Sequence, residues 1–328
     1  MTIKKIRRIH KKTEIPEYSR IKEIKSYITD DVPCNGTLVL EGGAFRGLYT
    51  AGVLDCLLDN NININTVVGI SAGALNGFNY LAGARGRSAL CILKHRYNSR
   101  YVGVKAIRES GSVVGFKFMF EDLNDEYPID ITRLTRGDKK LYAGCTNLET
   151  GKAEFIQTFN FEKMKLAVTA SASMPLVSRI VKIDDKKYLD GGCETKLPIR
   201  YAIENNFEKI IFVATRPLSY RRKLKASELK VEKVRYKNYP NFIKALANAN
   251  KRYNLDAEFL ESLAQRNGIL AISPSEPVSV SRLEKDIEKL GNLYMLGYED
   301  CKKQLPKIKE YLSKWKRFLV ETFFDWIN

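Results

Sequence analysis

Histidine is nearly absent from this chain, and its cysteines are not arranged in pairs. Among 328 residues there are 2 histidines and 6 cysteines, and no two cysteines have C-x-x-C spacing. A zinc site needs clustered thiolate and imidazole ligands, so this composition argues against one. Scattered thiols in a chain of this size are typical of reduced, buried side chains in a cytosolic protein. We therefore expect a cytoplasmic protein that uses no metal and no cofactor.

Long apolar runs are missing as well. The N-terminus is charged but has no apolar core segment, so it does not read as a signal peptide. No apolar run approaches the length that a membrane span requires. Any contact with a membrane is therefore expected to be peripheral, at its inner surface.

Acidic residues are in the minority. The chain has 55 Lys and Arg against 38 Asp and Glu, a formal net charge of +17. Basic residues gather in residues 1–12 and again in residues 216–237. Such clusters are usually solvated faces, but they also fit attraction to an anionic membrane or to nucleic acid. Because no nucleic-acid-binding motif is present, nucleic acid is not an expected partner.

Composition and periodicity divide the chain into three regions. These are a basic N-terminal arm (1–33), an α/β catalytic domain (34–240), and a mainly helical C-terminal region packed on the core (241–328). In the arm, Ile3, Ile6 and Ile9 recur every three residues, which fits either an amphipathic helix on a membrane or, as we favour, an arm packed on the domain. The last helix has an apolar stripe from Ile308 to Trp326, which favours a core-facing surface over a membrane-facing one.

The most informative stretch is NTVVGISAGALNG, residues 65–77. Its first six residues predict a short buried strand, and a run of helix-forming residues opens just after Ser71. Gly69 and Gly73 flank the serine in a G-x-S-x-G pattern. A serine on a sharp strand-to-helix turn has a strained backbone, and a side chain two residues away would collide across the turn. The pattern predicts a nucleophile elbow with its hydroxyl at the carboxyl edge of a sheet and a helix N-terminus behind it.

A glycine-rich loop precedes the elbow. Residues 37–40 predict a strand, EGGAFRG follows, and apolar residues then recur at helical spacing. A dinucleotide fingerprint would need glycine where Ala44 stands, and a P-loop would need a Gly-Lys-Ser/Thr ending. An oxyanion hole built from exposed backbone N–H groups fits better. Because adjacent parallel strands end at the same sheet edge, we expect this loop beside Ser71.

A serine hydroxyl needs a base within hydrogen-bonding reach. His10 lies in the basic arm and His95 on a predicted helix, and neither follows an acid in Ser…Asp…His order, so a Ser-His-Asp triad is not expected. Asp190 ends a predicted strand, and Gly191 and Gly192 permit a tight turn after it. Alone, D-G-G favours a plain turn aspartate. Together with the elbow and the glycine loop, it favours a Ser-Asp dyad in which a partly desolvated carboxylate contacts the hydroxyl directly.

Three motifs in this order resemble the patatin-like phospholipases, most closely the bacterial branch. They are GGAFRG (42–47), GISAG (69–73) and DGG (190–192). The resemblance continues through residues 171–178, 200–217 and 280–286, so that it covers roughly residues 36–300.

The resemblance implies a three-layer α/β/α sandwich with a mainly parallel central sheet, and acyl-ester hydrolysis with Ser71 as nucleophile and Asp190 as base. It also implies an oxyanion hole formed by the N–H groups of Gly42, Gly43 and Ala44, with Arg46 adding positive charge. The remaining motif glycines are Gly47, Gly69, Gly73, Gly191 and Gly192. The family usually has a third glycine where this chain has Ala44, and the extra methyl would strain the loop if the φ angle there were positive.

We therefore expect a serine acyl hydrolase of the phospholipase A, lysophospholipase or lipid esterase type, with a lipid or another acyl ester as substrate. The alternative is a catalytically weak lipid-binding or regulatory protein with the same fold, in which the basic clusters matter more than Ser71. Nucleic-acid binding would leave all three motifs unexplained. The sequence has no readable code for head group, acyl-chain length or oligomeric state.

Overall fold

An eight-stranded sheet forms the centre of the molecule. The computed structural model describes residues 16–224 and 229–313. The strand order is β10-β9-β2-β3-β5-β8-β7, with β6 paired to β5. The strands are β2 (Pro33–Leu40), β3 (Asn63–Ile70), β5 (Lys140–Asn147), β6 (Ala153–Ile156), β7 (Val181–Ile183), β8 (Lys186–Asp190), β9 (Ile210–Val213) and β10 (Leu270–Ile272). The sheet is parallel from β10 through β9, β2 and β3 to β5, whereas β6 and β8 both pair antiparallel to β5.

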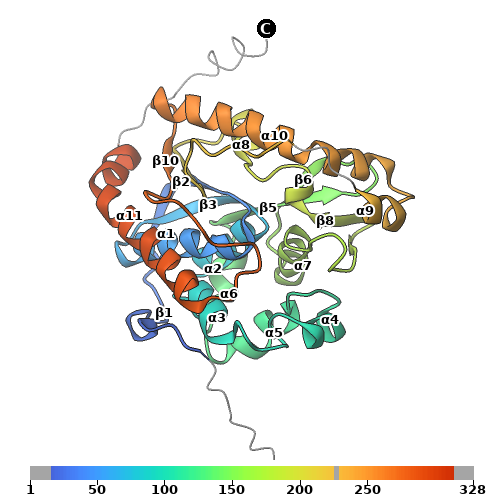
Figure 1. Ribbon diagram of the computed structural model, residues 1–328. Helices are drawn as coiled ribbons and strands as arrows, with labels where there is room; N and C mark the ends of the chain where they lie inside the picture. The colour runs from blue at the N-terminus through green and yellow to red at the C-terminus, as the bar shows by residue number, and fades with distance from the viewer. Residues whose placement is uncertain (1–15, 225–228, 314–328) are drawn as a thin grey trace, which may run out of the picture.

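Helices cover both faces of the sheet (Figure 1). One face carries α1 (Gly47–Asp59), α2 (Ala72–Leu81), α7 (Phe161–Ser171) and α11 (Ile287–Ser313), and the other carries α8 (Ile199–Glu204) and α10 (Pro240–Gln265). A hydrophobic core lies on each face of the sheet, and alternate residues of β2 belong to different cores. Leu38 and Leu40 pack with the first group of helices, and Val39 packs with the second. All three side chains are fully buried, as expected for a strand covered on both faces. The predicted three-layer α/β/α architecture is confirmed.

Two glycines bring α1 and α11 into backbone contact. A Cβ placed on Gly52 would lie 2.0 Å from the carbonyl oxygen of Tyr294, and one on Gly297 would lie 2.0 Å from that of Tyr49. The Tyr294 hydroxyl also donates a 2.9 Å hydrogen bond to Asp55 of α1. The last described helix is therefore part of the same core as the first.

Both ends of the described chain are part of the folded core. Beyond residue 240 the chain adds α10, α11 and β10, which extends the sheet beside β9. Ile308 and Leu312 of the predicted apolar stripe are buried, and the later members of the stripe lie outside the described residues. At the other end Tyr18, Ile21 and Ile24 join the core, and the short strand β1 (Tyr27–Ile28) pairs with β4 (Ala84–Arg85). The basic cluster in residues 1–12 also lies outside the described residues.

The stretch from residue 80 to 139 is built from short elements. It contains α3 (Arg87–His95), α4 (Val104–Ser110), α5 (Phe116–Phe120) and α6 (Ile131–Thr135). The predicted helix that carries His95 is α3, and it ends at that residue. A further short helix, α9 (Lys230–Arg235), precedes α10. No helix within residues 16–224 and 229–313 combines the length and apolarity needed to cross a bilayer.

Candidate active site

Ser71 stands at a strained turn between β3 and α2. Its φ and ψ angles are 55° and −119°, a backbone conformation that residues with a side chain rarely adopt. The flanking glycines are required sterically. A Cβ on Gly69 would lie 2.7 Å from the Gly73 carbonyl carbon, and a Cβ on Gly73 would lie 2.6 Å from the Leu40 carbonyl oxygen. The sequence therefore folds here into a sharp elbow at the end of β3.

The Ser71 hydroxyl contacts a buried carboxylate. Ser71 Oγ donates a 2.7 Å hydrogen bond to Asp190 Oδ2, and Gly192 N–H donates a 2.7 Å hydrogen bond to Asp190 Oδ1. Asp190 is only 7 % exposed, and burial raises the pKa of its carboxyl, opposed by the hydrogen bond from Ser71 and the charge of Lys196. A carboxylate that is desolvated and in direct contact with a hydroxyl is better suited to accept its proton than a solvated one.

Strand direction brings Asp190 to this position in an unexpected way. The sequence placed Asp190 at the end of a strand but did not give the direction of that strand, and β8 runs antiparallel to β5. Asp190 reaches the elbow because it pairs with Cys145, while the preceding residue of β5, Gly144, pairs with Ile70 at the end of β3. The register of three adjacent strands therefore fixes the separation of the two side chains.

Ser171, for which no role was predicted, supports the elbow from α7. Its hydroxyl donates a 2.6 Å hydrogen bond to the Gly144 carbonyl and accepts a 2.9 Å hydrogen bond from the Ser71 N–H. This hydroxyl thus links the strained backbone of the elbow to β5. The only sequence signal was its place in the segment 171–178 that resembles the family.

The glycine loop lies against the elbow. A Cβ on Gly47 would lie 2.8 Å from the Ala72 Cβ, and Asn76 of α2 donates a 2.8 Å hydrogen bond to the Gly47 carbonyl. Ala72 begins α2, so its N–H has no acceptor within the helix. The loop and the elbow therefore form one continuous surface beside the serine.

The loop departs from the expected oxyanion hole at its first residue. The Gly42 N–H donates a 3.1 Å hydrogen bond to the Lys196 carbonyl, so it is not available to a substrate. Within the described chain, no backbone acceptor is found for the N–H groups of Gly43 and Ala44. Ala44 has a φ angle of 49°, the left-handed conformation in which its methyl group is unfavourable. The loop therefore has two N–H groups available to a substrate, those of Gly43 and Ala44, and the backbone of Ala44 is strained.

Arg46 is buried and does not line the pocket. It is 4 % exposed, burial lowers its pKa to about 10, and the nearby charge of Glu41 opposes that shift. Lys196 is also desolvated, and burial together with the field of Arg222 lowers its pKa to about 8. Arg46, Lys196, Arg216, Arg222 and Arg282 form a cationic group around the site. None of the five forms an ion pair within the described residues, so the surroundings of the elbow are electropositive.

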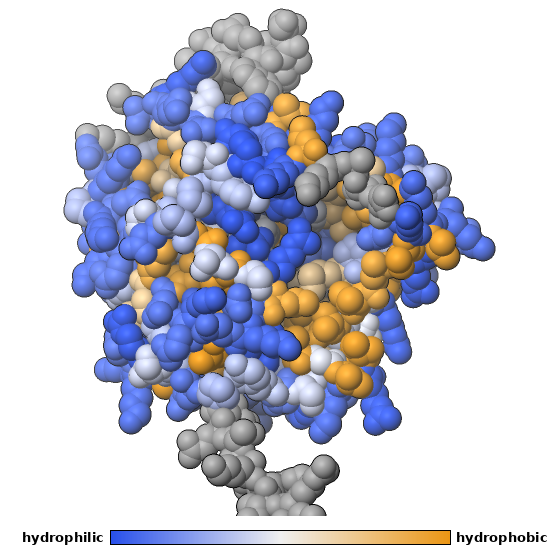
Figure 2. Space-filling model, in the orientation of Figure 1, coloured by the Kyte–Doolittle hydropathy of each residue, from blue (hydrophilic) through white to orange (hydrophobic). Residues whose placement is uncertain are grey.

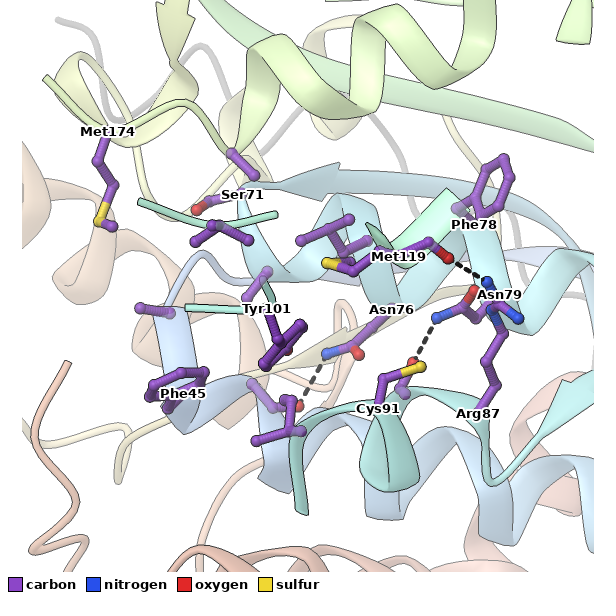
Figure 3. Close-up of a pocket in the computed structure, with 18 of the residues that line it drawn as sticks. Phe45, Ser71, Asn76, Phe78, Asn79, Arg87, Cys91, Tyr101, Met119 and Met174 are labelled. Carbon is purple, nitrogen blue, oxygen red and sulfur yellow. Dashed lines mark hydrogen bonds between the residues drawn. The ribbon is translucent and has the colours of Figure 1, made fainter. Parts of the chain in front are cut away.

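An apolar pocket opens from Ser71 (Figure 3). Its wall includes Leu75, Phe78, Ile92, Tyr101, Met119 and Met174. Figure 3 shows Ser71 and Met174 at one end, and Asn79 and Arg87 near the other. Arg87 is 2 % exposed and donates hydrogen bonds to the carbonyls of Met119 (2.6 Å) and Leu123 (3.3 Å). The pocket therefore suits an aliphatic chain along most of its length.

Comparisons with known proteins agree with this architecture. Residues 38–203 match the family model described as patatin-like phospholipase, and residues 239–313 match a domain of unknown function, DUF6363. Over 186 residues the chain is 25% identical to the uncharacterized protein YjjU of Escherichia coli K12, covering 55% of this chain and 52% of that protein. Over 193 residues it is 25% identical to the probable lipid hydrolase 463L of Invertebrate iridescent virus 6, covering 53% of this chain and 65% of that protein.

The matches to these relatives thus span between half and two thirds of their lengths. A solved structure, VipD from Legionella pneumophila, aligns with 91% of this chain and 72% of its own, at 13% identity and a TM-score of 0.41. The match to the family model covers half of the chain and includes the glycine loop, the elbow and Asp190. On that match, the chain belongs to the patatin-like phospholipase family.

Proposed function

We propose that this protein is a serine acyl hydrolase that cleaves carboxylic esters of lipids, with Ser71 as nucleophile and Asp190 as general base. The observation that supports this most directly is the 2.7 Å hydrogen bond between Ser71 Oγ and Asp190 Oδ2 at the mouth of an apolar pocket. Family membership and a relative named as a probable lipid hydrolase support the same substrate class.

In the proposed reaction Asp190 takes the hydroxyl proton as Ser71 Oγ attacks the ester carbonyl carbon. The carbonyl π electrons move to its oxygen, and the N–H groups of Gly43 and Ala44 stabilise the resulting oxyanion. The tetrahedral intermediate collapses, the alcohol leaves with the proton from Asp190, and the acyl group remains on Oγ. Water, deprotonated by Asp190, then attacks the acyl-enzyme, and the released Oγ recovers a proton from the carboxyl. No step of this scheme uses a metal ion.

The pocket and the charges around it divide the expected substrate into two parts. The apolar wall receives the acyl chain, since burying aliphatic groups there removes them from water. The cationic group lies near the loop and Asp190, where an anionic group on the alcohol part would be attracted. An ester of a phosphorylated alcohol fits this division better than a neutral ester of the same acid.

One observation favours a second candidate, a catalytically weak lipid-binding protein with the same fold. Ala44, one of the two proposed oxyanion donors, has a positive φ angle of 49° in a position where the family usually has glycine. Strain of this kind would be relieved by a small rotation of the peptide, which would turn an N–H away from the oxyanion.

A serine-directed fluorophosphonate probe separates the two candidates. An active dyad should label at Ser71, and both labelling and hydrolysis of p-nitrophenyl esters and defined phospholipids should disappear in Ser71→Ala. A folded protein that binds lipid but does not label would support the second candidate. Hydrolysis that persists in Ser71→Ala would refute the proposed nucleophile.

A further inference from the structure

Two short helices beside the pocket turn aliphatic side chains toward solvent. In α4, Val104 is 80% exposed and Ile107 is 47% exposed, whereas Ala106 is buried. In α9, Val231 is 62% exposed and Val234 is 76% exposed. Residues three apart share a helix face, so each helix has an outward apolar stripe. This is the reverse of the inward stripe of an ordinary surface helix.

The loop that follows Met174 joins the two helices into one surface. Leu176 N–H donates a 2.9 Å hydrogen bond to the Tyr236 hydroxyl, just after α9. The Val177 carbonyl accepts a 2.9 Å hydrogen bond from Val113 N–H, shortly after α4. Leu176 and Val177 are themselves 43% and 40% exposed. We call Val104, Ile107, Leu176, Val177, Val231 and Val234 the apolar band. Figure 2 shows hydrophobic surface running over α4 and toward α9.

The apolar band borders the entrance of the pocket. Met174, two residues before Leu176, lines the pocket together with Ser71. Leu283 also lines it and is 45% exposed. Exposed aliphatic side chains therefore stand on the rim that a lipid must cross to reach the serine hydroxyl.

Exposed cations accompany the band. Lys105 and Arg108 lie on α4, Lys233 and Arg235 lie on α9, and Arg179 follows the connecting loop. In the described part of the chain none of these five forms an ion pair. Of the acids on the two helices, Glu109 is already paired with Arg100 at 2.9 Å, which leaves Glu232. Aliphatic residues interleaved with cations match an interface that has acyl chains beneath anionic head groups.

We propose that the apolar band docks on the surface of an anionic lipid bilayer and holds the pocket entrance against it. The aliphatic side chains enter the boundary between head groups and acyl chains, and the cations contact the head groups. A water-soluble protein rarely exposes contiguous apolar surface without an interaction to cover it. Docking does not depend on catalysis, so the docking proposal can be tested independently of the hydrolase proposal.

The test uses the full chain with Ser71→Ala, so that the lipid is not consumed. Co-sedimentation is measured with phosphatidylcholine vesicles and with vesicles that also contain phosphatidylglycerol. The Ser71→Ala protein should bind the vesicles that contain phosphatidylglycerol more tightly than the phosphatidylcholine vesicles. Added salt should weaken this binding. Replacing Val104 and Val234 with serine should lower the partition coefficient about tenfold, which corresponds to about 1.4 kcal/mol. The matched control replaces Val32 and Leu255, which are 65% and 43% exposed outside the band, and should leave binding unchanged.

A second variant tests the charges: Lys233→Gln with Arg235→Gln should reduce the preference for anionic vesicles while retaining binding to neutral ones. The proposal would be overturned if the variant at Val104 and Val234 (the band variant) bound vesicles as well as the control variant at Val32 and Leu255. It would also be overturned if the Ser71→Ala protein itself bound no vesicle. If the band variant instead turned a dimer into a monomer on size-exclusion chromatography without changing vesicle binding, the band would be an interface between two copies, and the proposal would be wrong.

Discussion

Replacing Asp190 with asparagine should abolish most activity while leaving the fold intact. Asparagine has the same shape, and its Oδ1 can still accept the 2.7 Å hydrogen bond from Gly192 N–H. Its amide would face Ser71 Oγ, where it can donate a hydrogen bond but cannot take a proton. A positioned general base contributes about 10²–10⁴-fold to a rate, so kcat should fall by about that factor, or about 3–5 kcal/mol in activation free energy.

The same substitution should stabilise the fold at neutral pH. Burial raises the folded-state pKa of Asp190 above its unfolded value. A raised carboxyl pKa contributes stability that is fully present below the unfolded pKa and is lost as pH rises through the folded pKa. Asparagine has no charge to bury and does not undergo this loss. The variant should therefore have a larger free energy of unfolding than the parent at pH 7, and the difference should shrink toward about pH 3.

Two assays decide the outcome: ester hydrolysis with fluorophosphonate labelling, and urea unfolding between pH 3 and 8. Asp185→Asn is the matched control, because it has the same chemistry at an exposed turn just before β8 and should change neither activity nor stability. Retained activity in Asp190→Asn would refute the dyad. An inactive variant that is less stable than the parent at pH 7 would show that Asp190 is primarily structural.

Three further predictions follow from single contacts. Ala44→Gly should raise the free energy of unfolding by about 0.5–1 kcal/mol, because glycine tolerates the φ angle of 49°; a loss of stability in urea unfolding would contradict the assigned strain. Gly52→Ala should lower the free energy of unfolding by about 1–3 kcal/mol or more, since the new Cβ would lie 2.0 Å from the Tyr294 carbonyl oxygen. Gly268→Ala, whose new Cβ would have its nearest contact at 3.4 Å, should leave the free energy of unfolding nearly unchanged. The ratio of kcat/KM for a monoacylglycerol phosphate to kcat/KM for the matching monoacylglycerol should fall about two- to fivefold in Arg282→Gln. Arg266→Gln should leave this ratio unchanged. If the ratio in Arg282→Gln equalled that of the unsubstituted protein, Arg282 would have no part in substrate selection.

Local steric rules account for the parts of the site that the sequence predicted. Glycine at 69 and 73 is informative because a Cβ at either position would meet backbone atoms at 2.6–2.7 Å. Such a requirement is local, so it leaves a mark at fixed spacing from Ser71. The apolar runs at residues 37–40 and 65–70 likewise predicted strands, and such runs are expected where a parallel strand lies between two helical layers and has no polar side. These features follow from a few neighbouring residues.

The parts that were missed depend on distant segments. Nothing near Gly42 in the sequence shows that its N–H is bound to the carbonyl of Lys196, more than 150 residues later. The antiparallel direction of β8, and the position of Ser171 between β5 and the elbow, depend in the same way on the pairing of the whole sheet. The apolar band combines three segments, each too short and too mixed in composition to be noticed alone. Register and tertiary contact, rather than local pattern, determine these features.

The site gathers several unfavourable features that a protein core normally avoids. Burial is the largest influence on the pKa of Asp190, Glu41, Lys196 and Arg46, and in each case it favours the neutral form. Ser71 adds a strained backbone. Burying a charge costs free energy even where hydrogen bonds offset part of the cost, and strained residues persist only where the surrounding structure fixes them. Here the buried C-terminal halves of β2 and β3, the fully buried strand β9, and the close contact of α1 with α11 provide that rigidity. A structural role alone would be met more easily by apolar residues in these positions, so the concentration of charge and strain around Ser71 is itself an argument that the elbow does chemistry.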